Sequence, residues 1–97
     1  MRRREAVERL ERGAARLRRL GVRHLYLFGS TARDEAGLTS DVDLFVEQDT
    51  GSFGLLELLQ LQEETSALLG ASADVTTRDG LHPLLRARIE AEALRIF

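Results

Sequence analysis

The fold of this chain is decided between His24 and Glu47, where the sequence reads HLYLFGSTARDEAGLTSDVDLFVE. Residues 24–28 form a short apolar run of β-favouring residues, which predicts an inner strand with both faces buried. Residues 41–47 predict a second strand, in which the alternation of side chains places Val42, Leu44 and Val46 on one face. Gly29 ends the first strand, and Ser30 is expected to cap a short helix through residue 36.

The remaining sequence adds helices and a third strand. Apolar residues at spacings of three and four predict one amphipathic helix over 3–20, stopped by Gly21. A turn at 50–52 precedes a leucine-rich helix over 53–69, a third strand is expected over 73–77, and Pro83 opens a last helix through Leu94. The order αβαβαβα predicts an α/β (α+β) fold, with a small three-stranded sheet covered by about four helices.

Length and composition narrow the class of protein. With 97 residues and a net charge of −2, the chain is expected to form a single domain over 1–97. The absence of cysteine excludes disulfides, thiolate metal sites and cysteine nucleophiles. No apolar run is long enough for a membrane span or a signal peptide. We therefore expect a soluble, cytoplasmic protein with no membrane partner.

The turn after the first strand has the features of a phosphate site. Gly29 permits a tight turn and close approach of a phosphate, and Ser30 offers a hydroxyl and a backbone N–H at the start of a helix. Arg33, one turn further on, supplies a fork of donors for the same phosphates. The alternative is that Ser30 is only a helix cap.

Three aspartates supply the second part of the pattern. Asp41 and Asp43 leave the same face of a strand with Cα atoms about 6.5–7 Å apart, close enough to bind one hard cation. Asp74 opens the third strand and adds a third carboxylate. Such a set beside a phosphate site is typical of phosphoryl or nucleotidyl transfer with two Mg²⁺ ions. The alternatives are that Asp41 and Asp43 form the solvated side of a strand and that Asp74 is a turn residue.

Together these residues resemble a known signature. Gly29-Ser30, ten intervening residues and Asp41-x-Asp43 are similar to the motif of the nucleotidyltransferase superfamily, which includes polymerase beta and the kanamycin nucleotidyltransferases. The whole chain resembles the minimal nucleotidyltransferases (MNT). These are stand-alone palm domains commonly paired, as antitoxins, with a helical HEPN protein in toxin–antitoxin modules.

The resemblance implies a specific reaction. Gly29, Ser30 and Arg33 would bind the nucleotide phosphates, and the three aspartates would be the catalytic carboxylates and the ligands of Mg²⁺. AMP would move from ATP to a hydroxyl of a protein, namely a tyrosine of a cognate HEPN ribonuclease. One alternative is a non-catalytic antitoxin or regulatory subunit that neutralises its HEPN partner by binding. Another is a nucleotidyltransferase subunit for a small molecule, assisted by a separate substrate-binding subunit.

Other features have weaker functional interpretations. The leucines between 55 and 61 are too broadly spread for one small sheet to cover, so part of this cluster is a candidate contact in a homo- or hetero-oligomer. The arginine-rich first helix fits a solvated face better than a surface for RNA or an acidic partner, so nucleic acid is not expected as a partner. His24, Tyr26 and His82 are expected to be structural.

Overall fold

The structure is a computed structural model that describes residues 1–49, 51 and 53–97. The turn expected over 50–52 includes Thr50 and Ser52, which lie outside the described residues. In chain order, the elements are α1 (Arg3–Arg12), α2 (Ala14–Arg19), β1 (Val22–Phe28), α3 (Gly29–Ala32), β2 (Val42–Gln48), α4 (Leu55–Leu69), β3 (Ala73–Thr77), a 3₁₀ turn (Arg78–Gly80), α5 (Arg86–Glu92) and β4 (Leu94–Arg95). Within this described part, no helix combines the length and the apolar composition needed to cross a membrane.

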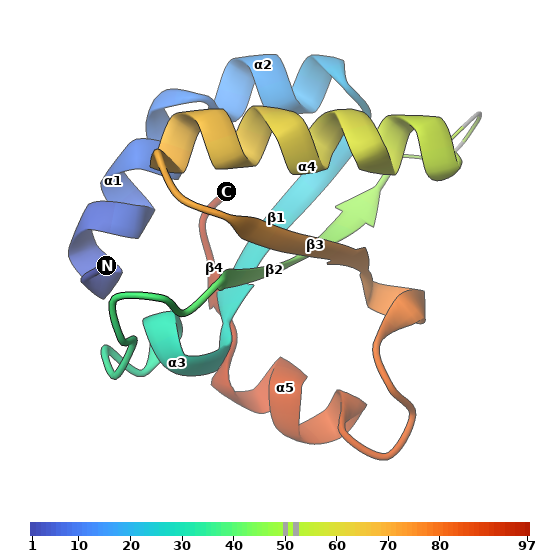
Figure 1. Ribbon diagram of the computed structural model, residues 1–97. Coiled ribbons are helices and arrows are strands. Elements are labelled where there is room, and N and C mark those ends of the chain that lie inside the picture. Colours follow the sequence, from blue (N-terminus) through green and yellow to red (C-terminus); the bar gives the residue numbers. More distant parts are fainter. Residues whose placement is uncertain (50, 52) are drawn as a thin grey trace.

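The strands form one mixed sheet in the order β3-β2-β1-β4 (Figure 1). The pairing of β1 with β2 and with β4 is antiparallel, whereas β2 and β3 are parallel. This arrangement confirms the predicted α/β class and the inner position of β1. The sheet has four strands rather than three, and the described residues form five α-helices rather than about four.

The core lies between one face of the sheet and helices α1, α2 and α4. In Figure 1, α2 and α4 lie above the sheet, whereas α3 and α5 lie below it. Val42, Leu44 and Val46 share this core, as the alternation in β2 predicts. The opposite face of β2 is not wholly solvated, because Phe45 is also buried. The other face of β1 is only half-buried, so the expectation that both faces are buried was wrong.

The first helix is broken at Gly13, where a single helix over 3–20 was expected. Gly13 separates α1 from α2, and a Cβ atom at this position would collide with the side chain of Leu68 on α4. The break therefore lies where α4 packs closely against the backbone. Periodicity gives no sign of such a break, because the apolar spacing continues across the glycine.

The end of the chain forms a strand where a helix through Leu94 was expected. Helix α5 begins at Arg86 rather than beside Pro83 and ends at Glu92, and β4 then pairs with β1. The N–H of Ile96 donates to the carbonyl of Leu25 at 2.7 Å, so β4 satisfies backbone groups on an edge of β1. The segment is therefore a strand rather than a helix because it pairs with backbone groups at the edge of β1.

The packing of β4 predicts unequal effects for two substitutions. Ile96 is 9% exposed and belongs to the core, whereas Leu94 on the same segment is 39% exposed. We expect Ile96→Ala to lower the free energy of unfolding by about 2–4 kcal/mol, because it leaves a cavity. Leu94→Ala, the matched control, should cost less than about 1 kcal/mol. Urea unfolding measures both, and equal losses would contradict the assignment of Ile96 to the core.

Candidate functional site

The turn between β1 and α3 allows a close approach that only glycine permits. Gly29 has a φ of 74°, in the left-handed region that other residues rarely adopt. A Cβ atom added there would collide with the carboxylate of Asp43, which faces the turn from β2. The predicted phosphate turn is therefore in direct contact with Asp43.

Two of the three predicted aspartates lie side by side. Asp43 on β2 is in register with Asp74 on the parallel neighbour β3. Asp43 is half-buried and Asp74 is exposed. Burial raises the pKa of Asp43, the charges of Asp74 and Asp41 raise it further, and Arg33 opposes them. The pair is thus a concentration of negative charge that is only partly compensated.

Asp41 lies just before β2 rather than within it, which corrects the predicted strand of residues 41–47 to Val42–Gln48. Asp41 is exposed and close enough to raise the pKa of Asp43. Within the described ranges, no three carboxylate or histidine side chains already form a cluster that would hold a metal ion. The three aspartates nevertheless offer only carboxylate oxygens, and their partly compensated negative charge fits a hard cation such as Mg²⁺.

Ser30 does not cap a helix, contrary to expectation. Helix α3 already begins at Gly29 and ends at Ala32, with Phe28 before it and no side-chain capping hydrogen bond. The short helix expected through residue 36 is therefore only one turn long. The hydroxyl of Ser30 is not used as a cap, so the capping alternative for this residue is wrong.

Arg33 follows α3 and contacts Glu92, a residue that sequence analysis did not identify. Its Nη1 donates to both carboxylate oxygens of Glu92, at 3.2 and 3.3 Å. The backbone N–H of Gly29 donates to Oε1 of the same side chain at 3.3 Å. Sequence analysis had no signal for Glu92, which lies 59 residues from Arg33 in an unremarkable helix. A pocket of about 180 Å³ lies beside these contacts, between the turn and α5.

Comparison with known proteins places this chain in a family. The family described as nucleotidyltransferase domain matches residues 7–96. The chain belongs to the nucleotidyltransferase domain family. This result confirms the resemblance drawn from the Gly-Ser and Asp-x-Asp pattern, and it identifies the chain as an enzyme of the nucleotidyltransferase class.

Individual relatives agree with this assignment. A relative from Methanocaldococcus jannaschii, provisionally named a protein adenylyltransferase, is 43% identical over 76 residues, covering 78% of this chain and 81% of its own. A solved structure provisionally described as a minimal nucleotidyltransferase has a TM-score of 0.83 and 34% identity, covering 97% of this chain and 95% of its own. The MNT antitoxin complex with the tri-AMPylated HEPN toxin of Shewanella oneidensis has a TM-score of 0.64 and 17% identity, covering 90% of this chain and 68% of its own.

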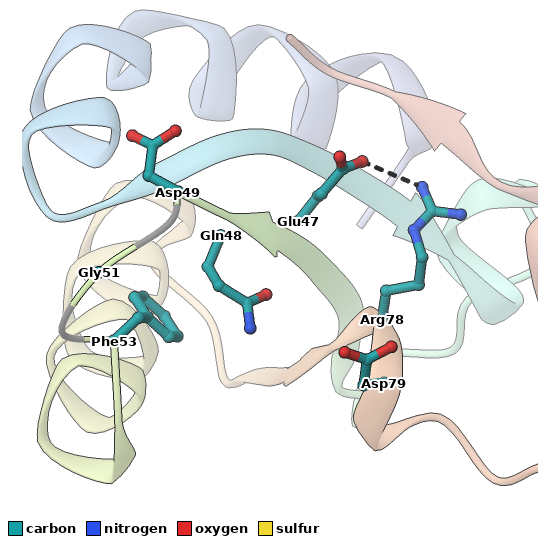
Figure 2. A pocket seen from close by; sticks show the side chains of 7 residues that line it. All are labelled: Glu47, Gln48, Asp49, Gly51, Phe53, Arg78 and Asp79. Atoms are coloured by element: carbon teal, nitrogen blue, oxygen red, sulfur yellow. Dashed lines mark ion pairs between the residues drawn. The ribbon is translucent and has the colours of Figure 1, made fainter.

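A pocket at the far end of β2 does not contain the predicted site. Figure 2 shows the side chains that line it, with an ion pair between Glu47 and Arg78. The pocket has a volume of about 460 Å³, and the ion pair measures 3.6 Å. None of the six predicted site residues lines it. The candidate site is therefore located by charge and register rather than by the size of a hollow.

The crowding at Asp43 predicts a stability gain from a conservative substitution. Because the pKa of Asp43 is raised in the folded chain, its ionised form destabilises the fold at pH values above that pKa. In metal-free buffer at pH 7, Asp43→Asn should raise the free energy of unfolding, with solvent screening keeping the gain below about 1 kcal/mol. The gain should disappear once the pH falls below the ordinary aspartate pKa, about 3.9.

Urea unfolding at several pH values tests this expectation. Asp49→Asn is the matched control, since Asp49 is an exposed carboxylate just beyond the other end of β2. It should change stability by less than about 0.5 kcal/mol. If Asp43→Asn is destabilising at pH 7 in metal-free buffer, the idea of unrelieved carboxylate repulsion is wrong.

Proposed function

We propose that this nucleotidyltransferase transfers AMP from ATP to a hydroxyl of a protein, and that residues 1–97 act as one minimal nucleotidyltransferase domain. The observation that carries the proposal is the placement of Asp43 and Asp74 side by side, with the Gly29 turn directly against Asp43. A phosphate-binding turn beside paired carboxylates is the arrangement that nucleotidyl transfer requires, because phosphates and metal ligands must meet at one phosphorus atom.

Each part of the site has a role in this proposal. The backbone of Gly29, the Ser30 hydroxyl and the Arg33 guanidinium hold the phosphates of ATP and orient its α-phosphorus. Asp41, Asp43 and Asp74 would hold two Mg²⁺ ions. When bound, these ions neutralise the charge that develops on the phosphate oxygens.

The transfer itself exchanges one bond at phosphorus for another. The acceptor oxygen forms a bond to the α-phosphorus, and the bond from that phosphorus to the pyrophosphate oxygen breaks. Asp74 accepts the proton of the acceptor hydroxyl, and its carboxylate is exposed, so an acceptor can reach it. AMP is then attached to the acceptor, and pyrophosphate leaves.

We further propose that the acceptor is a tyrosine of a HEPN partner. Two observations support a macromolecular acceptor. Asp41 and Asp74 are exposed, so a bulky substrate can reach the carboxylates without entering an enclosed cavity. In the Shewanella oneidensis complex of similar fold, the HEPN toxin bound to the MNT antitoxin is tri-AMPylated. Stoichiometric neutralisation by binding alone is the competing outcome of the test below.

Intact mass spectrometry tests the proposed reaction. The purified chain is incubated with ATP, Mg²⁺ and a HEPN protein encoded beside it, and both proteins are weighed. We expect the HEPN protein to gain the mass of one or more AMP groups. Asp43→Asn and Asp74→Asn should each reduce the rate by at least about 100-fold, because each removes a charged ligand from the reacting centre.

Two controls make the result specific. Asp49→Asn removes a carboxylate at the far end of β2 and should keep the wild-type rate. Asp43→Asn is expected to fold at least as stably as the wild type, so its loss of activity would not reflect unfolding. If the HEPN partner keeps its mass while the two proteins form a tight complex, the chain neutralises by binding and the transfer proposal is wrong.

A further inference from the structure

One carboxylate already occupies the donors that the proposed function assigns to the nucleotide. Oε1 of Glu92 accepts a hydrogen bond from the backbone N–H of Gly29 at 3.3 Å and another from Arg33 Nη1 at 3.2 Å. Its second oxygen lies 3.3 Å from the same nitrogen. The Glu92 side chain is 25% exposed, so these contacts are partly shielded from water.

We propose that Glu92 takes the place of a phosphate group in the nucleotide-free chain and that a bound triphosphate displaces it. This inference rests on the proposed function, because it concerns the same turn. Carboxylate and phosphate oxygens accept hydrogen bonds from the same donors, and the N–H of Gly29 has one proton to donate. Two anions at one position also repel each other. Glu92 is therefore the residue that sets the nucleotide affinity of the site.

Helix α5 is held in a way that permits this displacement. It has only seven residues, and none of them is buried, so its departure would not open the core. A helix this short is not stable by itself and depends on its contacts. Those contacts include three ion pairs, which are Arg33 with Glu92, Arg78 with Glu90 at 3.1 Å and Arg86 with Asp79 at 3.6 Å. Loss of the first pair would leave the other two to retain the helix.

The charged residues that line the pocket beside the turn favour the binding of an anion once Glu92 has been displaced. It is lined by Phe28, Leu85 and Ile89 together with the cations Arg33 and Arg88. Among the lining residues, Glu92 is the carboxylate that offsets these two positive charges, and Glu35 lies outside the lining, 3.5 Å from Arg33 Nε. Once Glu92 leaves, both guanidinium groups are available to a triphosphate, which raises the attraction of the site for anions.

Binding measurements on the whole chain test the role of Glu92. The probes are the Mg²⁺ complex of α,β-methylene-ATP, which cannot donate AMP, and inorganic tripolyphosphate. Calorimetry gives the affinity of the wild type, Glu92→Gln and Glu92→Asp for both probes. If Glu92 occupies the site most of the time, the apparent Kd of a probe equals its intrinsic Kd divided by the fraction of molecules in which the site is free. We therefore expect Glu92→Gln to bind both probes roughly 5- to 10-fold more tightly than the wild type.

Glu35→Gln is the matched control for charge near Arg33. Glu35 lies 3.5 Å from Arg33 Nε but does not contact the N–H of Gly29. Its substitution removes the same charge and should change affinity by less than about twofold. Glu92→Asp keeps the charge but is one methylene shorter and no longer reaches Gly29, so it should also bind more tightly than the wild type. Circular dichroism shows whether each variant is folded.

Several outcomes would overturn the inference. If Glu92→Gln binds no more tightly than Glu35→Gln, or binds more weakly, Glu92 orients Arg33 for the nucleotide instead of competing with it. If Glu92→Gln gains affinity while Glu92→Asp does not, the effect is one of net charge alone. If the wild type transfers AMP but neither Glu92→Gln nor Glu92→Asp binds the probes more tightly, only the proposed role of Glu92 is wrong. If no variant binds either probe, the proposed function fails as well.

Discussion

The parallel pairing of β2 with β3 places two carboxylates, Asp43 and Asp74, at neighbouring positions of one sheet. Like charges in this arrangement repel each other, and half-burial of Asp43 adds a desolvation cost that raises its pKa. The repulsion is tolerated because the residues on either side of each aspartate are fixed in the core. Val42 and Leu44 flank Asp43 on β2, and Ala73 and Val75 flank Asp74 on β3. All four side chains belong to the core cluster that includes residues of α1, α2 and α4.

Gly29 completes this constraint from a third direction. Because Phe28 of β1 pairs with Asp43, the turn that follows β1 must pass directly over the carboxylate. A glycine is needed there both for its positive φ and because no Cβ fits beside the carboxylate. The same register that crowds the negative charges therefore brings the phosphate-binding turn to them. Strand pairing would therefore make the proposed phosphate and metal sites adjacent.

The two faces of the sheet differ in how firmly they are covered. One face is sealed by α1, α2 and α4 with apolar side chains. On the other, Tyr26 stacks on Phe45 with ring centroids 4.6 Å apart, and the guanidinium of Arg78 lies 4.9 Å from the Tyr26 ring. Helix α5 has no buried residue, and three ion pairs join it to Arg33, Arg78 and Asp79. A rigid scaffold with a weakly held cover suits an enzyme whose substrates must enter and leave.

The sequence by itself determined the three main strands, the leucine-rich helix and the Gly29 and Asp43 parts of the site. These features follow from alternation, helical spacing and glycine stops, which act between residues close together in the chain. Tertiary structure alone decided the break at Gly13, the fourth strand and the contact of Glu92 with Gly29 and Arg33. Each of these depends on an atom that approaches from more than 50 residues away. Local periodicity carries no information about such a partner, so only the folded chain could reveal it.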